Sequence, residues 1–336
     1  MSWLINDNSI LIIAGLISAI STILIVPFVQ KIGFKYQIID DPDPRKMHTR
    51  PTVRLGGLAI IVSFLFTLYV IYTFINFGDL SILKIDKYIS IILISSSISF
   101  IVGILDDIYT SPYWLRLIAQ ILISILIWKT GIRINIIDLS LVPFLSAHYV
   151  NLNDFFSLIF NILWFCGITN SINWMDGLDG LASGITSIIA IGLLMISIVN
   201  GNFSMTLLSI ILAGSCLGFL KNNSYPSRIM MGDCGSYFLG STLAVMSIVA
   251  ISGINQEINL LVPFTLFLVP IADMSYVIIS RIFSGLSPFY PDRRHLHHRL
   301  IKLGFSYKKT VYIIYFLNLI TVILSFKIFQ LSLEIP

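Results

Sequence analysis

The segment 170–180 holds the side chains whose types and spacing are best suited to chemistry. Its sequence, Asn-Ser-Ile-Asn-Trp-Met-Asp-Gly-Leu-Asp-Gly, places Asn170, Asn173, Asp176 and Asp179 at intervals of three between two apolar runs. Oxygen-bearing side chains at the edge of a membrane segment are costly unless they meet an ion, a ligand or water. The segment is therefore a candidate ligand or metal site, and a polar loop between two spans is the alternative interpretation.

Helical geometry separates these four side chains. Steps of three residues turn a helix by about 300°, so the set spreads over about 180° and rises about 13.5 Å. One ion cannot reach all four side chains on a regular helix. Because Gly177 and Gly180 favour a break near Asp176, we expect the two asparagines to serve one task and the two aspartates another.

Two further acidic segments accompany this one. Asp106 and Asp107 directly follow an apolar run, and neighbouring carboxylates repel, so either one of them stays protonated or a cation holds both charges. Asp233 lies among glycines in the segment 231–236, which suits a metal ligand or a helix N-cap. These acids indicate an acid–base or metal role, with a solvated helix end as the alternative.

A basic loop precedes the second apolar run. It carries Lys46, His48 and Arg54 among prolines and acids, and its lysine and arginine side chains can neutralise phosphates. The alternative is a basic loop beside the membrane that sets topology and contacts anionic lipid.

A second basic segment, 292–299, contains three histidines. His295, His298 and Arg299 share a face if the segment is helical, whereas His297 points elsewhere. Histidine clusters are typical of zinc sites. The flanking arginines disfavour a dication, so the segment favours contact with phosphate or sugar, and a plain basic loop remains the alternative.

The composition indicates a polytopic membrane protein. The chain has 336 residues, of which 56% are hydrophobic and 11% charged, whereas soluble domains carry about 25% charge. Its net charge of +4 is small, and we expect no nucleic-acid partner. Ten apolar runs approach the roughly 20 residues that cross a bilayer. We predict an all-α fold in one domain, 1–336, with spans at 10–29, 56–77, 88–105, 114–128, 155–169, 181–199, 205–220, 237–253, 260–280 and 311–329.

Two spans and one connection have special features. The first span lacks the basic leader of a signal peptide, so we expect a retained helix. Pro263 and Pro270 predict a kinked or broken ninth helix. The connection 129–154 alternates apolar and polar residues at its start, which predicts a short strand or hairpin on the outer surface.

The distribution of positive charge predicts the orientation. Of the 21 Lys and Arg residues, 16 lie in the odd-numbered connections or just inside the fourth span. The positive-inside rule makes those connections cytoplasmic and both termini external. All the polar segments then lie on one side, so we expect the active site to be built from loops 30–55, 106–113, 170–180, 221–236 and 281–310.

Acids for a hard cation and bases for phosphates favour Mg²⁺, or Mn²⁺, and phosphoryl chemistry between a soluble donor and a lipid. A transporter is the rival class, because acids within spans would be its signature. Only Asp273 is expected inside a span, and a purely structural membrane protein explains none of the polar segments.

The polar segments together resemble the polyprenyl-phosphate N-acetylhexosamine-1-phosphate transferases. The resemblance implies ten or eleven helices, a cytoplasmic site and Mg²⁺ dependence, in a bacterial inner (plasma) membrane. The motifs that carry it occur in the family's order and are Asp41-Pro42, Arg45-Lys46-Met47-His48, Gly56-Gly57, Asp106-Asp107, the segment 170–180, Met231-Gly232-Asp233-Cys234-Gly235-Ser236 and His295-Leu296-His297-His298-Arg299.

The His-Leu-His-His-Arg motif resembles the undecaprenyl-phosphate α-N-acetylglucosaminyl 1-phosphate transferase branch, whose products start surface-polysaccharide, lipopolysaccharide or teichoic-acid assembly. The substrates implied are UDP-N-acetylglucosamine and undecaprenyl phosphate, and a homodimer is left open. The alternative branch transfers phospho-N-acetylmuramoyl-pentapeptide and usually has consecutive histidines here. Met230 departs from the family, which often has an aromatic residue there that stacks on uracil.

The resemblance also implies roles for single residues. Asn173 and Asp233 are expected to bind Mg²⁺, and Asp106, with Asp107 beside it, to position or deprotonate the lipid phosphate. The expected catalytic residues are Asp106, Asp107, Asp176, Asp179, His295 and His298, and the expected substrate-binding residues are Lys46, His48, Arg54, Asn170, His297 and Arg299.

Overall fold

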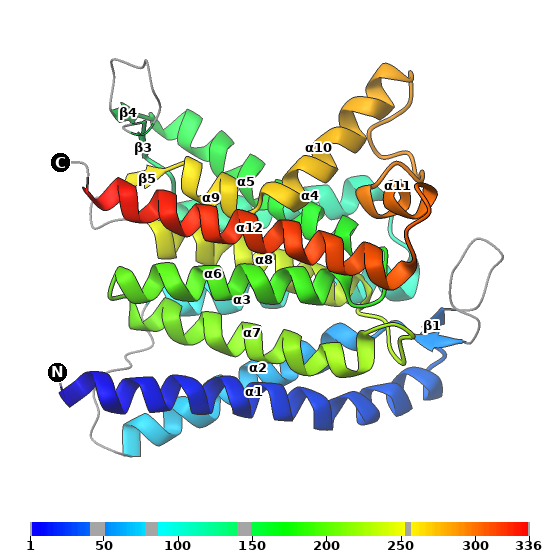
Figure 1. Ribbon diagram of the computed structural model, residues 1–336, viewed down its shortest axis with the longest axis horizontal. Helices are drawn as coiled ribbons and strands as arrows, with labels where there is room; N and C mark the ends of the chain where they lie inside the picture. Colours follow the sequence, from blue (N-terminus) through cyan, green and yellow to red (C-terminus); the bar gives the residue numbers. More distant parts are fainter. Residues whose placement is uncertain are drawn as a thin grey trace.

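The structure is a computed structural model that describes residues 2–40, 51–77, 87–139, 141, 149–252 and 257–334. Within these ranges the protein is a bundle of helices with a few short strands at its two ends (Figure 1). The helices are α1 Ser2–Lys35, α2 Gly56–Phe77, α3 Lys87–Tyr109, α4 Tyr113–Lys129, α5 Asp154–Met175, α6 Leu181–Val199, α7 Phe203–Asn223, α8 Gly232–Ile251, α9 Leu261–Leu266, α10 Leu268–Phe283, α11 Leu296–Lys302 and α12 Tyr307–Glu334.

Eight of the described helices are long and apolar enough to cross a membrane: α1, α2, α3, α5, α6, α7, α8 and α12. The shorter α4 and the α9–α10 pair coincide with the two remaining predicted spans. The protein is therefore an all-α, multi-pass membrane protein, as predicted. The start of α1 and the end of α12 lie at the same end of the bundle, and α11 lies at the other (Figure 1).

Several helices extend further into the polar segments than predicted. Asp106 and Asp107 belong to α3, Asn170 and Asn173 to α5, and Asp233 to the first turn of α8. The predicted loops 106–113, 170–180 and 221–236 are therefore partly helical. Polar residues at helix ends resemble loop residues in sequence, but inside a bundle they face partner side chains and the helix continues.

The ninth span is broken, as its prolines predicted. α9 ends at Leu266, and Phe267 departs from helical geometry with φ −101° before α10 begins. Pro270 lies in the first turn of α10, where a backbone N–H has no intrahelical acceptor. Figure 1 shows α10 diverging from the bundle axis and carrying the connection to α11 away from the other helices.

Two small sheets are present in the described residues. β1 Ile39–Asp40 pairs antiparallel with β2 Thr52–Val53. In the other sheet β3 Ile136–Asp138 pairs antiparallel with β4 Tyr149–Asn151, which confirms the predicted hairpin. β5 Glu257–Asn259 adds a parallel strand beside β3, a partner too distant in sequence for local patterns to reveal.

Helix α8 is the centre of the bundle, since its whole candidate span is buried. Small residues let its neighbours approach closely. A Cβ on Gly57 of α2 would lie 2.2 Å from the backbone nitrogen of Gly235, and one on Gly103 of α3 would lie 2.5 Å from the backbone oxygen of Asp233. These glycines therefore set the positions of α2 and α3 against the first turn of α8.

Replacing Gly57 with alanine should destabilise the protein by about 2 to 3 kcal/mol, because the new methyl group meets backbone that cannot move aside. The measurement is thermal unfolding of the purified protein in detergent. Gly167→Ala in α5 is the matched control, because its Cβ would meet only the Met274 side chain, at 4.0 Å. Equal stability of the two variants would contradict the prediction.

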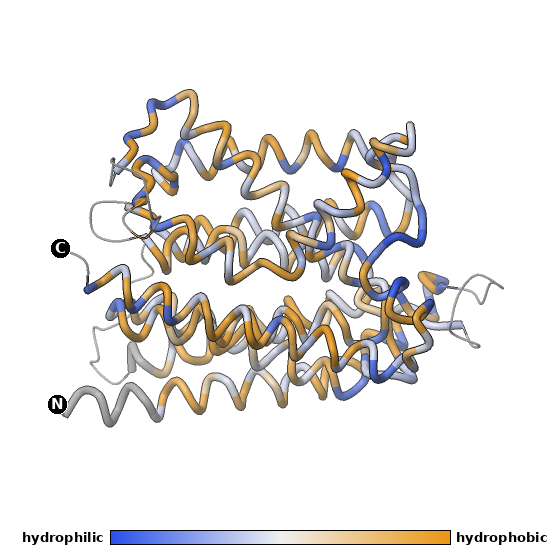
Figure 2. Tube along the Cα trace, turned by 45° about the horizontal axis from the view of Figure 1, so that its top comes forward, coloured by the Kyte–Doolittle hydropathy of each residue, from blue (hydrophilic) through white to orange (hydrophobic). Residues whose placement is uncertain are grey.

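Hydropathy differs between the ends and the middle of the bundle. Apolar residues dominate the helices along their length, whereas hydrophilic residues gather at the end that holds β1 and α11 (Figure 2). The acidic and basic segments singled out in the sequence converge on this polar end.

Candidate active site

A cavity of about 710 Å³ opens at the polar end. It is bounded by the end of α5, the start of α8, residues beside β1 and β2, and the region of α11 and α12. The lining residues are Asp40, Arg54, Asn173, Asp176, Gly177, Leu178, Asp179, Asn223, Met230, Met231, Gly232, Asp233, Arg293, His298, Ile301, Lys302 and Tyr307.

Asn173 and Asp233 meet in this cavity from two helices distant in sequence. The Nδ2 of Asn173 donates to Asp233 Oδ1 at 2.6 Å and to Ser236 Oγ at 2.8 Å. Because both acceptors take the amide nitrogen, the Oδ1 of Asn173 points away from them. The pair thus offers one amide oxygen and one carboxylate to a ligand.

Arg54 lies among three carboxylates. Its guanidinium nitrogens are 3.7 Å from Asp107 Oδ1, 3.8 Å from Asp233 Oδ2 and 3.9 Å from Asp40 Oδ1. Arg54 lines the cavity with a side chain that is 35% exposed, so it combines the predicted access to a phosphate with a structural role among the acids.

Asp107 caps helix α8 from α3. Its Oδ1 and Oδ2 accept hydrogen bonds from the backbone N–H groups of Asp233 and Cys234, both at 2.9 Å. Its side chain is fully buried and does not line the cavity. The structure therefore gives this predicted catalytic residue a positioning role for Asp233, because the first turn of α8 otherwise lacks acceptors for its donors.

Asp106 faces away from the cavity into a second polar cluster. It accepts from Arg116 Nη1 at 2.6 Å and from the Ser111 backbone N–H at 2.7 Å. Nearby, Asn170 Nδ2 donates to Gln120 Oε1 at 2.6 Å. Asn170 thus joins α5 to α4, while Asn173 joins α5 to α8. The two asparagines were expected to serve one task, but the structure gives them different partners.

Asp176 and Asp179 both line the cavity, as the break after Met175 allows. Burial raises the pKa of Asp176 well above its usual range, and the charges of Asp233 and Asp107 add to this effect. Asp179 Oδ2 accepts from the Ser227 backbone N–H at 3.0 Å. Both aspartates therefore face the same cavity as Asn173, whereas Asn170 does not line it.

The donor set fits a hard dication. In the described part of the chain no three His, Cys, Asp or Glu side chains are grouped to hold a metal. Mg²⁺ does not need three, because it keeps several waters and takes oxygens from substrate phosphates. The charge of Arg54 only partly offsets the crowding of Asp176 with Asp233 and Asp107, which leaves negative charge that such an ion would neutralise.

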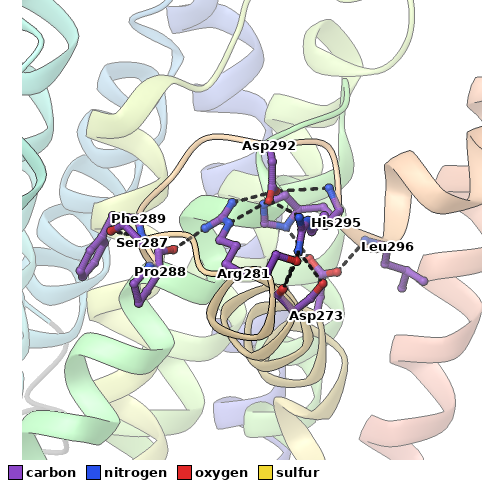
Figure 3. A network of polar contacts seen from close by, with 11 residues as sticks. Asp273, Arg281, Ser287, Pro288, Phe289, Asp292, His295 and Leu296 are labelled. Atoms are coloured by element: carbon purple, nitrogen blue, oxygen red, sulfur yellow. Dashed lines mark hydrogen bonds and ion pairs between the residues drawn. The ribbon is translucent and has the colours of Figure 1, made fainter.

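Figure 3 shows how α10 holds the basic segment. Asp273, buried in α10, accepts from the Leu296 backbone N–H at 2.6 Å and lies 2.8 Å from Nδ1 of His295. Arg281 forms two hydrogen bonds with Asp292, at 3.1 and 3.0 Å. These contacts fix the start of α11, and the sequence had placed Asp273 in a span without a partner.

The histidine-rich segment is arranged differently from the prediction. His295 precedes α11 rather than lying on it, so it does not share a helix face with His298 and Arg299. Of the motif, only His298 lines the cavity. Arg299 lies 4.0 Å from the ring centroid of Tyr276, and His297 is 2% exposed and packs on Gly177. Substrate contact by Arg299 or His297 is therefore not supported by their positions.

Lys46 and His48 lie outside the described residues. Several cavity residues were missed in the sequence. Lys302 follows His298 by four positions on α11, a spacing that places both on one face and could have revealed it. Arg293 belongs to the basic segment 292–299 that the sequence singled out, whereas Tyr307, at the start of a helix, carried no such signal.

Burial and the neighbouring His298 and His295 lower the pKa of His297 to about 3, so this ring is neutral in the folded protein at ordinary pH. The unfolded ring titrates near 6.5, so below that pH the unfolded state binds more protons and stability falls as pH falls. Thermal unfolding from pH 7.5 to 5 should show this loss, at most about 1.4 kcal/mol per pH unit. His297→Gln should lessen the slope, and an unchanged slope would contradict the prediction.

Comparison with known proteins shows the family of this chain. Residues 89–251 match the sequence model of glycosyl transferase family 4. A probable undecaprenyl-phosphate N-acetylglucosaminyl 1-phosphate transferase of Bacillus subtilis is 31% identical over 92% of this chain and 82% of its own length. The chain belongs to glycosyl transferase family 4. The resemblance predicted from the motifs is thereby confirmed.

Other members are similarly related. A decaprenyl-phosphate N-acetylglucosaminephosphotransferase of Mycobacterium leprae is 30% identical over 91% of this chain and 80% of its own length. A phospho-N-acetylmuramoyl-pentapeptide-transferase of Staphylococcus saprophyticus is 28% identical, over 92% and 95% respectively. The family match begins after the Arg54 region and ends before α11, so the cavity combines matched residues with others outside that range.

Proposed function

We propose that the protein transfers N-acetylglucosamine 1-phosphate from UDP-N-acetylglucosamine to undecaprenyl phosphate. An oxygen of the lipid phosphate forms a bond to the β-phosphorus of the donor. The bond from that phosphorus to the bridging oxygen breaks, and UMP leaves with the electron pair. The product is a lipid-linked sugar pyrophosphate that initiates cell-surface polysaccharide synthesis.

One observation carries this proposal: a single cavity at the polar end of a membrane bundle joins carboxylates with cationic side chains. Asp233 and Asn173 lie on one side, and Arg293, His298 and Lys302 come from the region of α11. Such a cavity suits a donor that carries two phosphates, and its place beside apolar helices suits an acceptor delivered by the bilayer.

Asn173 and Asp233 would hold Mg²⁺, or Mn²⁺, in the loaded enzyme. When bound, the ion would neutralise the charge that develops on the pyrophosphate oxygens. Arg54 orients Asp233 and neutralises phosphate, and Asp107 keeps the first turn of α8 in place. Asp106 accepts hydrogen bonds from Arg116 and from the Ser111 backbone outside the cavity lining, so its proposed part is to hold Arg116 in place rather than to remove a proton.

The proposed site faces the cytoplasm of a bacterial plasma membrane, with both termini outside. The distribution of Lys and Arg supports this orientation. The cavity residues His298 and Lys302 belong to α11, which lies at the end opposite the start of α1 and the end of α12 (Figure 1). A membrane-impermeant thiol reagent tests the orientation in two variants, Ser332→Cys and Ser224→Cys. Added outside intact cells, it should label the cysteine at 332 and not the one at 224.

A second candidate is transfer of phospho-N-acetylmuramoyl-pentapeptide. The His-Leu-His-His-Arg motif and the greater identity to the N-acetylglucosamine relatives favour the first proposal. Purified protein with UDP-N-acetylglucosamine, undecaprenyl phosphate and Mg²⁺ should release UMP. Absence of UMP, with turnover of the muramoyl-pentapeptide donor, would assign the chain to the other activity.

A further inference from the structure

The cavity wall contains one tyrosine ring that has no role in the proposed reaction as described above. Among the described lining residues, Tyr307 at the start of α12 is the sole Phe, Tyr or Trp. Leu178 and Met230 give the same cavity some apolar lining. The carboxylates and cations described above supply no surface for a flat, weakly polar group.

Contacts from two segments hold this ring in place. The Tyr307 hydroxyl accepts a hydrogen bond from the backbone N–H of Asp179. Behind it, Tyr225 lies with its ring centroid 4.5 Å away and its plane tilted by 30°. The Lys308 ammonium lies 6.0 Å from the centroid of Tyr225, so aromatic and cationic groups support one another.

The backing residue is itself anchored to the cavity. Asp179 Oδ2 accepts from the backbone N–H of Ser227, two residues after Tyr225. Asp179 therefore contacts Tyr307 through its own backbone N–H and holds the segment 225–227, which carries Tyr225, through its carboxylate. Tyr307 is consequently a fixed plane, which loses little rotational freedom when a ligand covers it.

We propose that Tyr307 is the aromatic surface on which the nucleobase of the sugar-nucleotide donor stacks, an inference that rests on the proposed function. Stacking on an aromatic side chain stabilises any nucleobase, because every base has a π-face. A base on Tyr307 directs its phosphates into a cavity whose other walls carry Arg54, Arg293 and Lys302. Tyr307 is then a donor-binding residue supplied by a helix outside the matched family region.

Kinetics of three variants test the role of the ring. Tyr307→Leu should raise KM for UDP-N-acetylglucosamine about tenfold, the loss expected for one base–aromatic stack, with kcat and the KM for undecaprenyl phosphate unchanged. Tyr307→Phe keeps the ring and should stay within about twofold of wild type. Tyr312→Leu is the matched control, because this residue on the same helix is 67% exposed and does not line the cavity.

The outcomes separate the ring from its hydroxyl and from the fold. An unchanged KM in Tyr307→Leu overturns the proposal, and so does an equal effect in Tyr307→Phe, because the hydrogen bond to Asp179 would then be the cause. If Tyr307→Leu fails to fold, Tyr307→Trp, which keeps an aromatic plane, should retain donor KM, and a loss there overturns the proposal.

Equilibrium binding keeps this inference distinct from the proposed function. UMP and ribose 5-phosphate are titrated into wild type and Tyr307→Leu without lipid. The preference for UMP should fall about tenfold in the variant even if no transfer is detected, in which case the proposed function fails and the stacking surface stands. Transfer by wild type with the same UMP preference in both proteins leaves the function standing and removes the stacking surface.

Discussion

Replacing Asp233 with asparagine should lower the rate of UMP release about a thousandfold while the protein keeps its fold. The amide has the shape of the carboxylate and can still accept the 2.6 Å hydrogen bond from Asn173. What it lacks is the negative charge that the proposed cation site requires. The loss should fall mainly on kcat, because charge on the pyrophosphate oxygens develops in the transition state.

Asp154→Asn is the control for this experiment. Asp154 begins α5 at the opposite end from Asn173, and its side chain is 80% exposed. This variant should behave as wild type. Turnover by Asp233→Asn within about threefold of wild type at limiting Mg²⁺ would remove Asp233 from the proposed cation site.

Replacing Arg281 with methionine should free the connection between α10 and α11, at a cost of about 3 kcal/mol in local stability. The Arg281 side chain is 4% exposed and donates to both oxygens of Asp292 and, at 2.5 Å, to the carbonyl of Pro288 (Figure 3). Methionine fills a similar volume but leaves Asp292 without its main partner. Hydrogen exchange across residues 284–296 should rise, and turnover should fall because His298 and Lys302 lose their position.

Arg294→Met is the matched control. Arg294 also contacts Asp292, at 3.1 Å, but its side chain is 30% exposed, so its removal should cost less than about 1 kcal/mol. Equal hydrogen exchange in the two variants would show that burial of Arg281 does not matter.

The pH dependence of this contact is also defined. Burial opposes ionisation of Asp292, but hydrogen bonds from Arg281 and the Arg294 backbone, with the charges of both arginines, lower its pKa below the ordinary value. A lowered pKa in the folded state gives stability that is present above the unfolded value of about 3.9 and is lost as pH falls below it. The contact should therefore be constant between pH 5 and 8, unlike the effect of His297.

Much of the architecture follows from local sequence. Long apolar runs gave the spans, because a bilayer demands about 20 apolar residues for each crossing, and prolines located the break between α9 and α10. The resemblance to the family, rather than a local pattern, paired Asn173 with Asp233 and gave Asp176 and Asp179 a separate role. The cavity brings those four together.

Local sequence does not reveal a side chain's partner when that partner is distant along the chain. Asp107 was expected beside Asp106 at the lipid phosphate, and the structure adds that it caps α8, 126 residues away. Asp273 was a lone acid in a span, yet it holds His295 and the start of α11. In both cases the residue type states only that a partner is needed, and packing selects which one.

The amino-acid sequence by itself therefore determined the class of this protein: a helical membrane bundle with acids and bases gathered at one end, because hydrophobicity and charge act residue by residue. The tertiary structure decided which of these residues line the cavity and which support it. Close glycine contacts around α8 place Asp233 at the cavity and bury Asp107 behind it. In the segment that follows α10, His298 lines the cavity and His297 is buried. These choices depend on helix-to-helix distances, which no local pattern contains.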